Sequence, residues 1–236
     1  MDFNTTLIRG TLVKRYKRFL SDHLLDDGTI VTAHVANPGS MLGLNTPGIE
    51  TWLSTNNNPK RKLKFSWELA KIKELNTGLV GVNTHLANKL AFEAIKSNTI
   101  QELTDYSIIK KEVKYGSRNS RIDILLQSET APDAYVEVKS VTMCRESDAE
   151  FPDSVTARGT KHLYELQDIA LSKKRAVIFF IVQRSDCYNF RIAHDIDPIY
   201  FKAFSDALKN GVEAICYSCK METNSIYIDK SVRIIN

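Results

Sequence analysis

The first third of the chain alternates short apolar stretches with turn-forming residues. We expect five short strands, at residues 10–25, 29–36, 49–55, 62–72 and 77–84. The segment DDG at 26–28 predicts a hairpin turn, and residues 37–48 pack Pro and Gly into a tight connection. Short strands with glycine at the corners are typical of a small closed barrel of the oligonucleotide-binding (OB) type.

The rest of the chain carries longer helical and strand patterns. We expect helices at residues 83–98, 156–174 and 201–211, and strands at 106–116, 120–126, 134–141, 175–183 and 212–218. Residues 175–183 are almost continuously apolar, which is typical of a strand covered on both faces. The predicted fold class is α/β (α+β overall), with an OB-like barrel over residues 1–82 and a C-terminal α/β domain over residues 83–236.

Three charged residues interrupt two strands that are otherwise apolar enough to be buried. They are Asp123 in SRIDILL and Glu137 and Lys139 in AYVEVKSV. Side chains at i and i+2 of a strand share a face, so Glu137 and Lys139 are expected side by side. Ile122 and Ile124 should take the core face of their strand, which leaves Asp123 on the other side, free to meet Glu137. Burying such charges is costly unless they are paired or bound.

Two facing carboxylates repel, and a divalent cation that prefers oxygen ligands relieves the repulsion. Glu93 falls within about 60° of the leucine face of its predicted helix and would be a third oxygen donor. Lys139 would act on a metal-bound water or on developing phosphoryl charge, which suits hydrolysis of a phosphodiester. The competing interpretation is a structural salt bridge of Lys139 with Glu137 or Asp123.

Net charge is +4, and its distribution points to the barrel. Residues 1–82 hold 11 Lys+Arg against 7 Asp+Glu, whereas residues 83–236 hold 21 of each. Basic clusters of this kind suit a polyanion, although a solvated surface explains them equally well. We expect these side chains to guide a DNA backbone: Lys14, Arg15, Lys17, Arg18, Lys60, Arg61 and Lys62. The interleaved aromatics Tyr16, Phe19 and Trp67 could stack bases or fill the barrel core.

The composition indicates an ordinary globular protein. No run of about 18 apolar residues predicts a membrane span, and the first 20 residues lack the layout of a signal peptide. We therefore expect a cytoplasmic protein. Four cysteines predict no disulfide framework, and Cys216 and Cys219 are expected to be ordinary reduced residues on opposite faces of a strand.

Several long segments resemble a known family. Asp123 followed by Glu137-Val138-Lys139 resembles the PD-(D/E)XK restriction-endonuclease-like superfamily. The segments LVKRYKRFL, EVKYGSRNSRIDILL, YVEVKSVT and FPDSVTARGTKHLYEL resemble the bacterial sugar fermentation stimulation protein A (SfsA) family. This resemblance implies an OB-like barrel joined to a restriction-endonuclease-like α/β domain, DNA binding and a link to the regulation of sugar metabolism, particularly maltose.

The resemblance also implies roles for individual residues. Asp123 and Glu137 would hold Mg²⁺ (or Mn²⁺) together with the Val138 carbonyl, with Glu93 as a helix-borne acid and Lys139 acting on the attacking water. Substrate contacts are expected from the RG-x-KHL motif, through Arg158, Lys161 and His162. Two hypotheses follow: a DNA-binding protein with a Mg²⁺-dependent phosphodiesterase site, or a non-catalytic DNA-binding regulator. The oligomeric state stays open, with a homodimer among the options.

Overall fold

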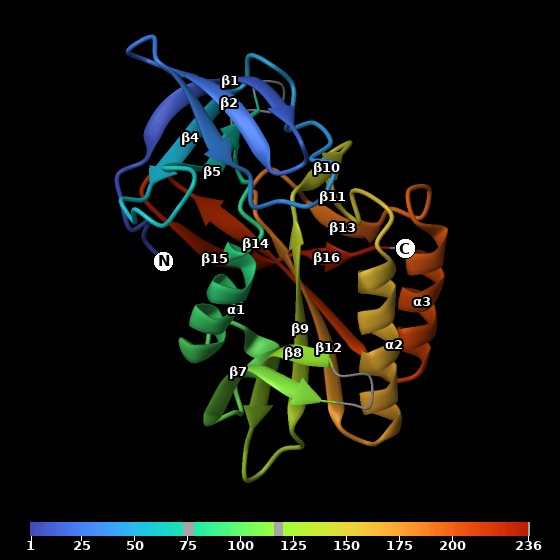
Figure 1. Ribbon diagram of the computed structural model, residues 1–236. Coiled ribbons are helices and arrows are strands. Elements are labelled where there is room, and N and C mark those ends of the chain that lie inside the picture. Colours follow the sequence, from blue (N-terminus) through green and yellow to red (C-terminus); the bar gives the residue numbers. More distant parts are fainter. Residues whose placement is uncertain (73–77, 116–119, 236) are drawn as a thin grey trace.

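The computed structural model describes residues 1–72, 78–115 and 120–235. Figure 1 shows a small barrel at one end of the molecule and a larger α/β domain below it. In the described part of the chain, no helix is long and apolar enough to cross a membrane.

The barrel is built from the first six strands. Their bounds are β1 Ile8–Tyr16, β2 Leu20–Leu25, β3 Ile30–His34, β4 Glu50–Thr55, β5 Phe65–Lys71 and β6 Leu79–Gly81. The strand order is β3-β2-β1-β4-β5-β6, and a parallel pairing of β3 with β5 closes five of the strands into a barrel. The predicted single strand over residues 10–25 is wrong, because the chain turns at Lys17 and Arg18, whose φ angles are 47° and 64°.

The three barrel aromatics differ in position, and Tyr16 is half-buried, with its hydroxyl donating to Asp22 (3.0 Å). Trp67 is fully buried, and its indole N–H donates to the Leu69 carbonyl over 2.8 Å. It packs edge-on against His23, which is buried between the hydroxyls of Ser21 and Thr51. Phe19 instead stays 41% exposed at the turn between β1 and β2. Burial of the indole provides much of the apolar contact that closes the barrel.

The second domain is built on a six-stranded sheet in the order β15-β14-β12-β9-β8-β7. The strands are β7 Ile108–Tyr115, β8 Ser120–Gln127, β9 Ala134–Val141, β12 Arg175–Val182, β14 Glu213–Met221 and β15 Ile226–Ser231. The central strands β9, β12 and β14 are mutually parallel. Seven consecutive residues of β12 are buried, as the continuous apolar run predicted.

Helices cover both faces of this sheet. Helix α1 (Leu86–Lys96) covers one face, and α2 (Ala157–Leu171) and α3 (Pro198–Lys209) cover the other. The two cores receive opposite sides of β14: Cys216 packs with α2 and α3, and Cys219 packs with the α1 side. Both thiols are free, as expected.

A small second sheet was not predicted. Its order is β10-β11-β13-β16, from β10 Met143–Arg145, β11 Asp148–Phe151, β13 Asn189–Ile192 and β16 Arg233–Ile234. A single turn of 3₁₀-helix, Gln101–Leu103, follows α1. Strands of two to four residues carry too little periodicity to be recognised in a sequence.

Hydrogen bonds join the barrel to the second domain at several places, among them one from the Gly81 N–H to the Gln183 carbonyl (2.8 Å). The Ala36 carbonyl accepts from the backbone N–H (3.0 Å) and the hydroxyl (2.9 Å) of Thr84. On the other side, the Ser40 hydroxyl donates to the Asp153 carbonyl (2.6 Å), and the Met41 N–H donates to the Asp153 carboxylate (2.9 Å). These contacts fix the barrel above the edge of the sheet where β9 ends.

Candidate active site

Strand β8 separates from β9 at Asp123. Their antiparallel pairing runs from Leu126 to Ile124 and ends there. On the other side of β8, Glu112 of β7 lies between two paired positions, opposite Asp123, and has a left-handed backbone with φ 53°. Ile122 packs beneath α2 and α3, whereas Ile124 packs beneath α1. The predicted alternation, with both isoleucines on one face, is therefore wrong at this point.

Asp123 is held by two donors. One carboxylate oxygen accepts from the backbone N–H of Val138 (2.8 Å), and the other accepts from the Asn88 side-chain amide on α1 (2.7 Å). Burial, and after it the negative charge of Glu137, raise the pKa of Asp123 to about 6. The aspartate is thus kept in place while its ionised form is poorly compensated.

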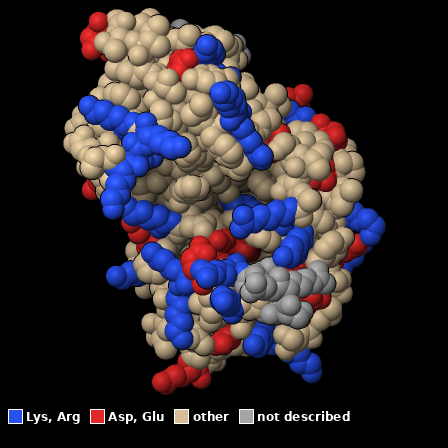
Figure 2. Space-filling model, viewed as in Figure 1, with Lys and Arg blue, Asp and Glu red and all other residues tan. Residues whose placement is uncertain are grey.

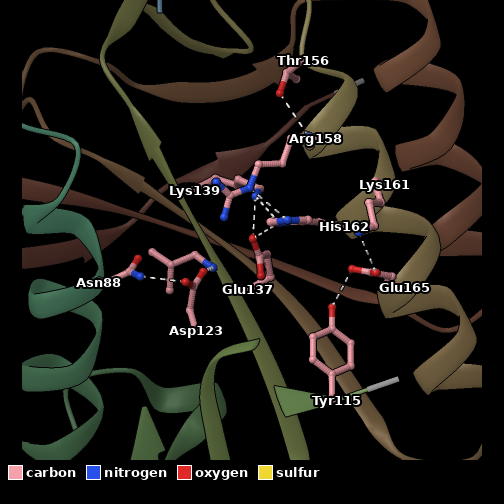
Figure 3. Close-up of polar contacts among 12 residues, drawn as sticks. Asn88, Tyr115, Asp123, Glu137, Lys139, Thr156, Arg158, Lys161, His162 and Glu165 are labelled. Carbon is pink, nitrogen blue, oxygen red and sulfur yellow. Dashed lines mark hydrogen bonds and ion pairs between the residues drawn. The ribbon is translucent and has the colours of Figure 1, made fainter. Parts of the chain in front are cut away.

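Glu137 is buried on β9 and faces α2. Its Oε1 accepts from Lys139 Nζ (2.7 Å) and contacts His162 Nδ1. Burial acts to raise the pKa of Glu137, but Lys139 and His162 outweigh it and lower the pKa to about 2. Its second oxygen, Oε2, is buried and has no hydrogen-bond partner among the described residues. Figure 3 shows Asp123 and Glu137 side by side, the first toward α1 and the second toward α2.

Helix α2 brings two further side chains to this place. The Thr156 hydroxyl caps the helix by accepting from the Gly159 N–H (3.1 Å), so the first turn points at the site. The Arg158 Nε donates to His162 Nε2 (3.3 Å). Since Nε2 is then an acceptor, the neutral imidazole carries its hydrogen on Nδ1 and donates it to Glu137. Lys139 Nζ lies 3.1 Å from the same Nδ1.

Lys139 and Arg158 line a cleft of about 300 Å³ between the barrel and the second domain, and the other groups lie just beneath its floor. Figure 2 shows Lys and Arg side chains around a hollow between the two domains. The barrel contributes the loop at Asn37–Gly39 to the wall, and the second domain contributes Val138 and Lys139 of β9. The first turns of α1 and α2 also line it, so two helix N-termini face the cleft.

Family models account for most of the chain. Residues 13–82 match the model described as SfsA N-terminal OB domain, and residues 85–225 match the model described as Sugar fermentation stimulation protein RE domain. The chain belongs to the SfsA family. Both domains therefore confirm the expected fold, an OB barrel followed by an α/β domain that resembles restriction endonucleases.

Curated relatives in the SfsA family are similar over their whole lengths. The sugar fermentation stimulation protein homolog of Paramagnetospirillum magneticum is 52% identical, over 96% of this chain and 94% of its own. That of Pseudoalteromonas atlantica is 46% identical over 100% of both. A solved structure, the SfsA of Pyrococcus furiosus in complex with Ca²⁺, superimposes with a TM-score of 0.89 at 24% identity and covers 100% of this chain and 98% of that one.

Most of the nuclease-motif residues expected in this SfsA family member meet at the cleft. Val138, Lys139 and Arg158 line it. Asp123, Glu137 and His162 lie just beneath and contact those three residues. Lys161 lies on the same helix and pairs with Glu165 at 3.6 Å, and Glu165 also accepts from the Tyr115 hydroxyl (3.2 Å).

Glu93 does not lie with them. Its carboxylate faces the N-terminal amine of Met1 (3.3 Å) and Lys89 (4.0 Å), beside Tyr227 and Ile228. The residue of α1 that reaches Asp123 is Asn88, which lies about 140° from Glu93 around the helix. An uncharged amide among polar residues carried no signal that sequence reasoning could use.

The basic residues of the barrel divide into two groups. Arg15 donates to the carbonyls of Arg18 (2.8 Å), Asn37 (3.0 Å) and Gly39 (2.9 Å), so its guanidinium shapes the loop that walls the cleft. Arg18 donates to Pro38 (2.9 Å) but is exposed and lines the cleft. The other side chains predicted to contact DNA are also exposed: Lys14, Lys17, Lys60, Arg61 and Lys62. Carbonyls accept from both terminal nitrogens of Arg15, and its buried Nε has no partner among the described residues. The expected contact of Arg15 with a phosphate stays a prediction.

Proposed function

We propose that the cleft is a metal-dependent phosphodiesterase site that acts on DNA. The observation that carries this proposal is the pairing of Asp123 with Glu137 at the point where β8 leaves β9, with Lys139 beside them. A structural ion pair needs one carboxylate for one ammonium. The second carboxylate adds repulsion that costs stability unless a cation relieves it.

The chain's own residues fit a divalent cation that prefers oxygen. Asp123 has a raised pKa, and Glu137 Oε2 is a buried oxygen without a described partner. Among the described residues, no three His, Cys, Asp or Glu side chains are gathered to hold a metal ion. Mg²⁺ commonly uses only one or two carboxylates and takes its other ligands from water and phosphate. We assign Asp123, Glu137 and the Val138 carbonyl to Mg²⁺ or Mn²⁺, and the SfsA of Pyrococcus furiosus, solved with Ca²⁺, supports a divalent ion.

When bound, such a cation polarises the phosphoryl group and lowers the pKa of its water. Lys139 places an ammonium beside the reacting phosphorus, where it orients the water or stabilises developing negative charge. Arg158 contacts the phosphate, and the positive ends of the α1 and α2 helix dipoles attract it. Val138 and Asn88 keep the Asp123 carboxylate from turning away.

The barrel supplies sequence-independent affinity. Arg18 lies at the cleft, and the side chains of Lys17, Lys60, Arg61 and Lys62 are exposed. They present positive charge without fixed carboxylate partners among the described residues. Contacts of this kind bind phosphates and position the duplex or strand without reading its bases.

A second function has one observation in its favour. Lys139 and His162 both contact the Glu137 carboxylate, which is also what a purely structural cluster would do. In that case the protein binds DNA as a regulator, consistent with a family name that refers to sugar fermentation, and cuts nothing.

The deciding experiment incubates linear, nicked, supercoiled and single-stranded DNA with the purified protein and Mg²⁺, Mn²⁺ or EDTA. Asp123→Asn and Lys139→Ala should abolish metal-dependent products. The matched controls are Asp206→Asn and Lys202→Ala, which change an exposed ion pair on α3. DNA that is bound but uncut in every condition leaves the regulator as the function.

A further inference from the structure

A second cavity borders the cleft across the contact between Ala36 and Thr84. Its volume is about 680 Å³. Consecutive residues of the chain line the two spaces in turn: Asn37 and Thr84 line the cleft, and Ala36 and His85 line the cavity. The wall of the cavity is polar, and Arg61 and Lys89 are accompanied there by Asp2 and Glu68. The barrel contributes side chains from the β4–β5 loop and from β3: Asn56, Asn57, Arg61 and His34.

A stack of three side chains links the two spaces over the barrel surface. The guanidinium of Arg18, which lines the cleft, lies 5.5 Å from the centre of the Phe19 ring. The Phe19 ring stacks on that of His34, which lines the cavity, with 6.4 Å between centroids and 21° between planes. The Phe19 ring is 41% exposed, and at 6.4 Å its stacking on His34 is laterally offset, so part of its aromatic face stays open to a nucleobase.

The cleft cannot widen without breaking contacts on both of its sides. Two hydrogen bonds join Ala36 to Thr84, and two more join Ser40 and Met41 to Asp153. Arg15 makes the intervening loop rigid through its carbonyls. A volume of about 300 Å³ lies at the lower end of the roughly 300–1,000 Å³ of small-ligand sites. It has room for about one nucleotide, not for paired strands.

The catalytic groups are recessed, with Lys139 at the floor of the cleft and Glu137 beneath it. The side chains of Lys139 and Glu137 are 12% and 3% exposed. A phosphate of a rigid duplex cannot move far from the helix surface to follow a narrow cleft down to recessed groups. A single strand can instead lead one phosphate to the floor while its neighbouring bases turn outward.

We propose that this protein takes single-stranded DNA, threaded from the cleft over the Arg18–Phe19–His34 stack into the cavity beside Arg61. The inference rests on the proposed function and names the strand state of its substrate. Base stacking on Phe19 supplies affinity that does not depend on sequence, and Arg18 and Arg61 contact the phosphates at either end of the stack.

The test measures binding without cleavage. Fluorescence anisotropy in EDTA compares a labelled single strand of about 16 nucleotides, the upper site size of one OB fold, with the blunt duplex of the same sequence. We expect the single strand to bind at least about tenfold more tightly. Phe19→Ala should weaken single-strand binding by about tenfold, the effect of losing one stacked base, and leave duplex binding unchanged.

Two further variants make the result specific. Phe19→Trp keeps an aromatic face and should retain single-strand affinity. Tyr188→Ala removes an aromatic that is 78% exposed and lines neither space, and should change nothing. Equal affinity for both forms, tighter duplex binding, or a Phe19→Ala protein that binds single strands normally would each overturn the inference. This assay contains EDTA and measures binding alone. If the separate experiment with Mg²⁺ or Mn²⁺ gave no cleavage, the proposed function would be refuted and the binding result would stand.

Discussion

The backbone N–H of Val138 donates a hydrogen bond of 2.8 Å to the Asp123 carboxylate. Since β8 has left β9 before this point, the side chain of Asp123 takes the place of the missing strand partner. Asp123 thereby accepts from a backbone N–H that β8 no longer pairs with, and it also presents a carboxylate to the site. A group held by a strand is positioned more rigidly than one on a loop, and we expect the site to be largely preformed.

The first prediction concerns the stability that the protein loses by burying the Asp123 carboxylate. Its raised pKa means that the folded protein binds this proton more tightly than the unfolded chain does. The ionised carboxylate therefore destabilises the fold increasingly as pH rises toward 6, and the destabilisation is complete above that pH. Asp123→Asn should therefore raise the free energy of unfolding at pH 7 by about 1–3 kcal/mol, and by much less at pH 4. Urea denaturation at both values measures the difference.

The same variant checks the metal assignment without any activity. Mg²⁺ or Ca²⁺ should raise the melting temperature of the unaltered protein and not that of Asp123→Asn, because only a bound ion stabilises the folded state. Equal stabilisation of both proteins would show that the ion binds elsewhere.

The second prediction compares two residues of α1. Asn88 donates to Asp123, and Asn88→Asp would put a third negative charge against the pair and lower cleavage by about tenfold or more. Glu93→Gln removes a carboxylate that faces Met1 and Lys89, and should leave the cleavage rate unchanged. If Glu93→Gln were the more damaging of the two, the role assigned to Asn88 would fail.

The third prediction concerns acid stability of the barrel. Burial lowers the pKa of His23 to about 4, so its contribution to stability is full above the usual value of 6.5 and is lost as pH falls toward 4. The free energy of unfolding should fall by about 1–3 kcal/mol over this range. His23→Gln should flatten that part of the profile, whereas His194→Gln, at an exposed position, should not.

The fourth prediction tests the contact that closes one side of the cleft. A methyl group added at Gly39 would lie 2.3 Å from both carboxylate oxygens of Asp153. Gly39→Ala therefore forces this carboxylate away from the Met41 N–H and should cost about 1–3 kcal/mol. Asp153→Ala loses the same hydrogen bond, so the double variant should cost less than the sum of the two. Additive costs in urea denaturation would contradict this coupling.

The fifth prediction concerns salt. Affinity for DNA should fall steeply between about 50 and 200 mM salt because phosphate contacts release counterions. Arg158→Ala should reduce the slope of log affinity against log salt by about one, and Lys202→Ala on α3 should leave it unchanged. Binding that is indifferent to salt would argue against the basic barrel and the cleft as the DNA site.

The sequence was most informative where chemistry and periodicity coincide. Strand β9 has the predicted bounds of residues 134–141, and Glu137 and Lys139 lie together on it as their spacing of two requires. A buried strand that carries an acid and a lysine is unusual enough to be recognised without a structure.

Residue type alone could not separate equivalent candidates. Glu93 and Asn88 lie on the same helix, and only the way α1 packs on the sheet decides which one reaches Asp123. Arg15 and Arg18 lie in one basic segment and both donate to carbonyls of the loop at residues 37–39, yet only Arg18 is exposed and lines the cleft. A guanidinium donates to a carbonyl and to a phosphate through the same N–H groups, so the residue type does not predict which partner an arginine takes.

By itself, the sequence determined the barrel followed by an α/β domain, the central strands and the acid–lysine motif, because apolar periodicity and residue chemistry are local properties. Tertiary structure alone decided where β8 leaves β9, that Asn88 holds Asp123, and that the barrel walls a narrow cleft. Each of these depends on contacts between residues tens of positions apart in the chain, whose geometry no local pattern encodes.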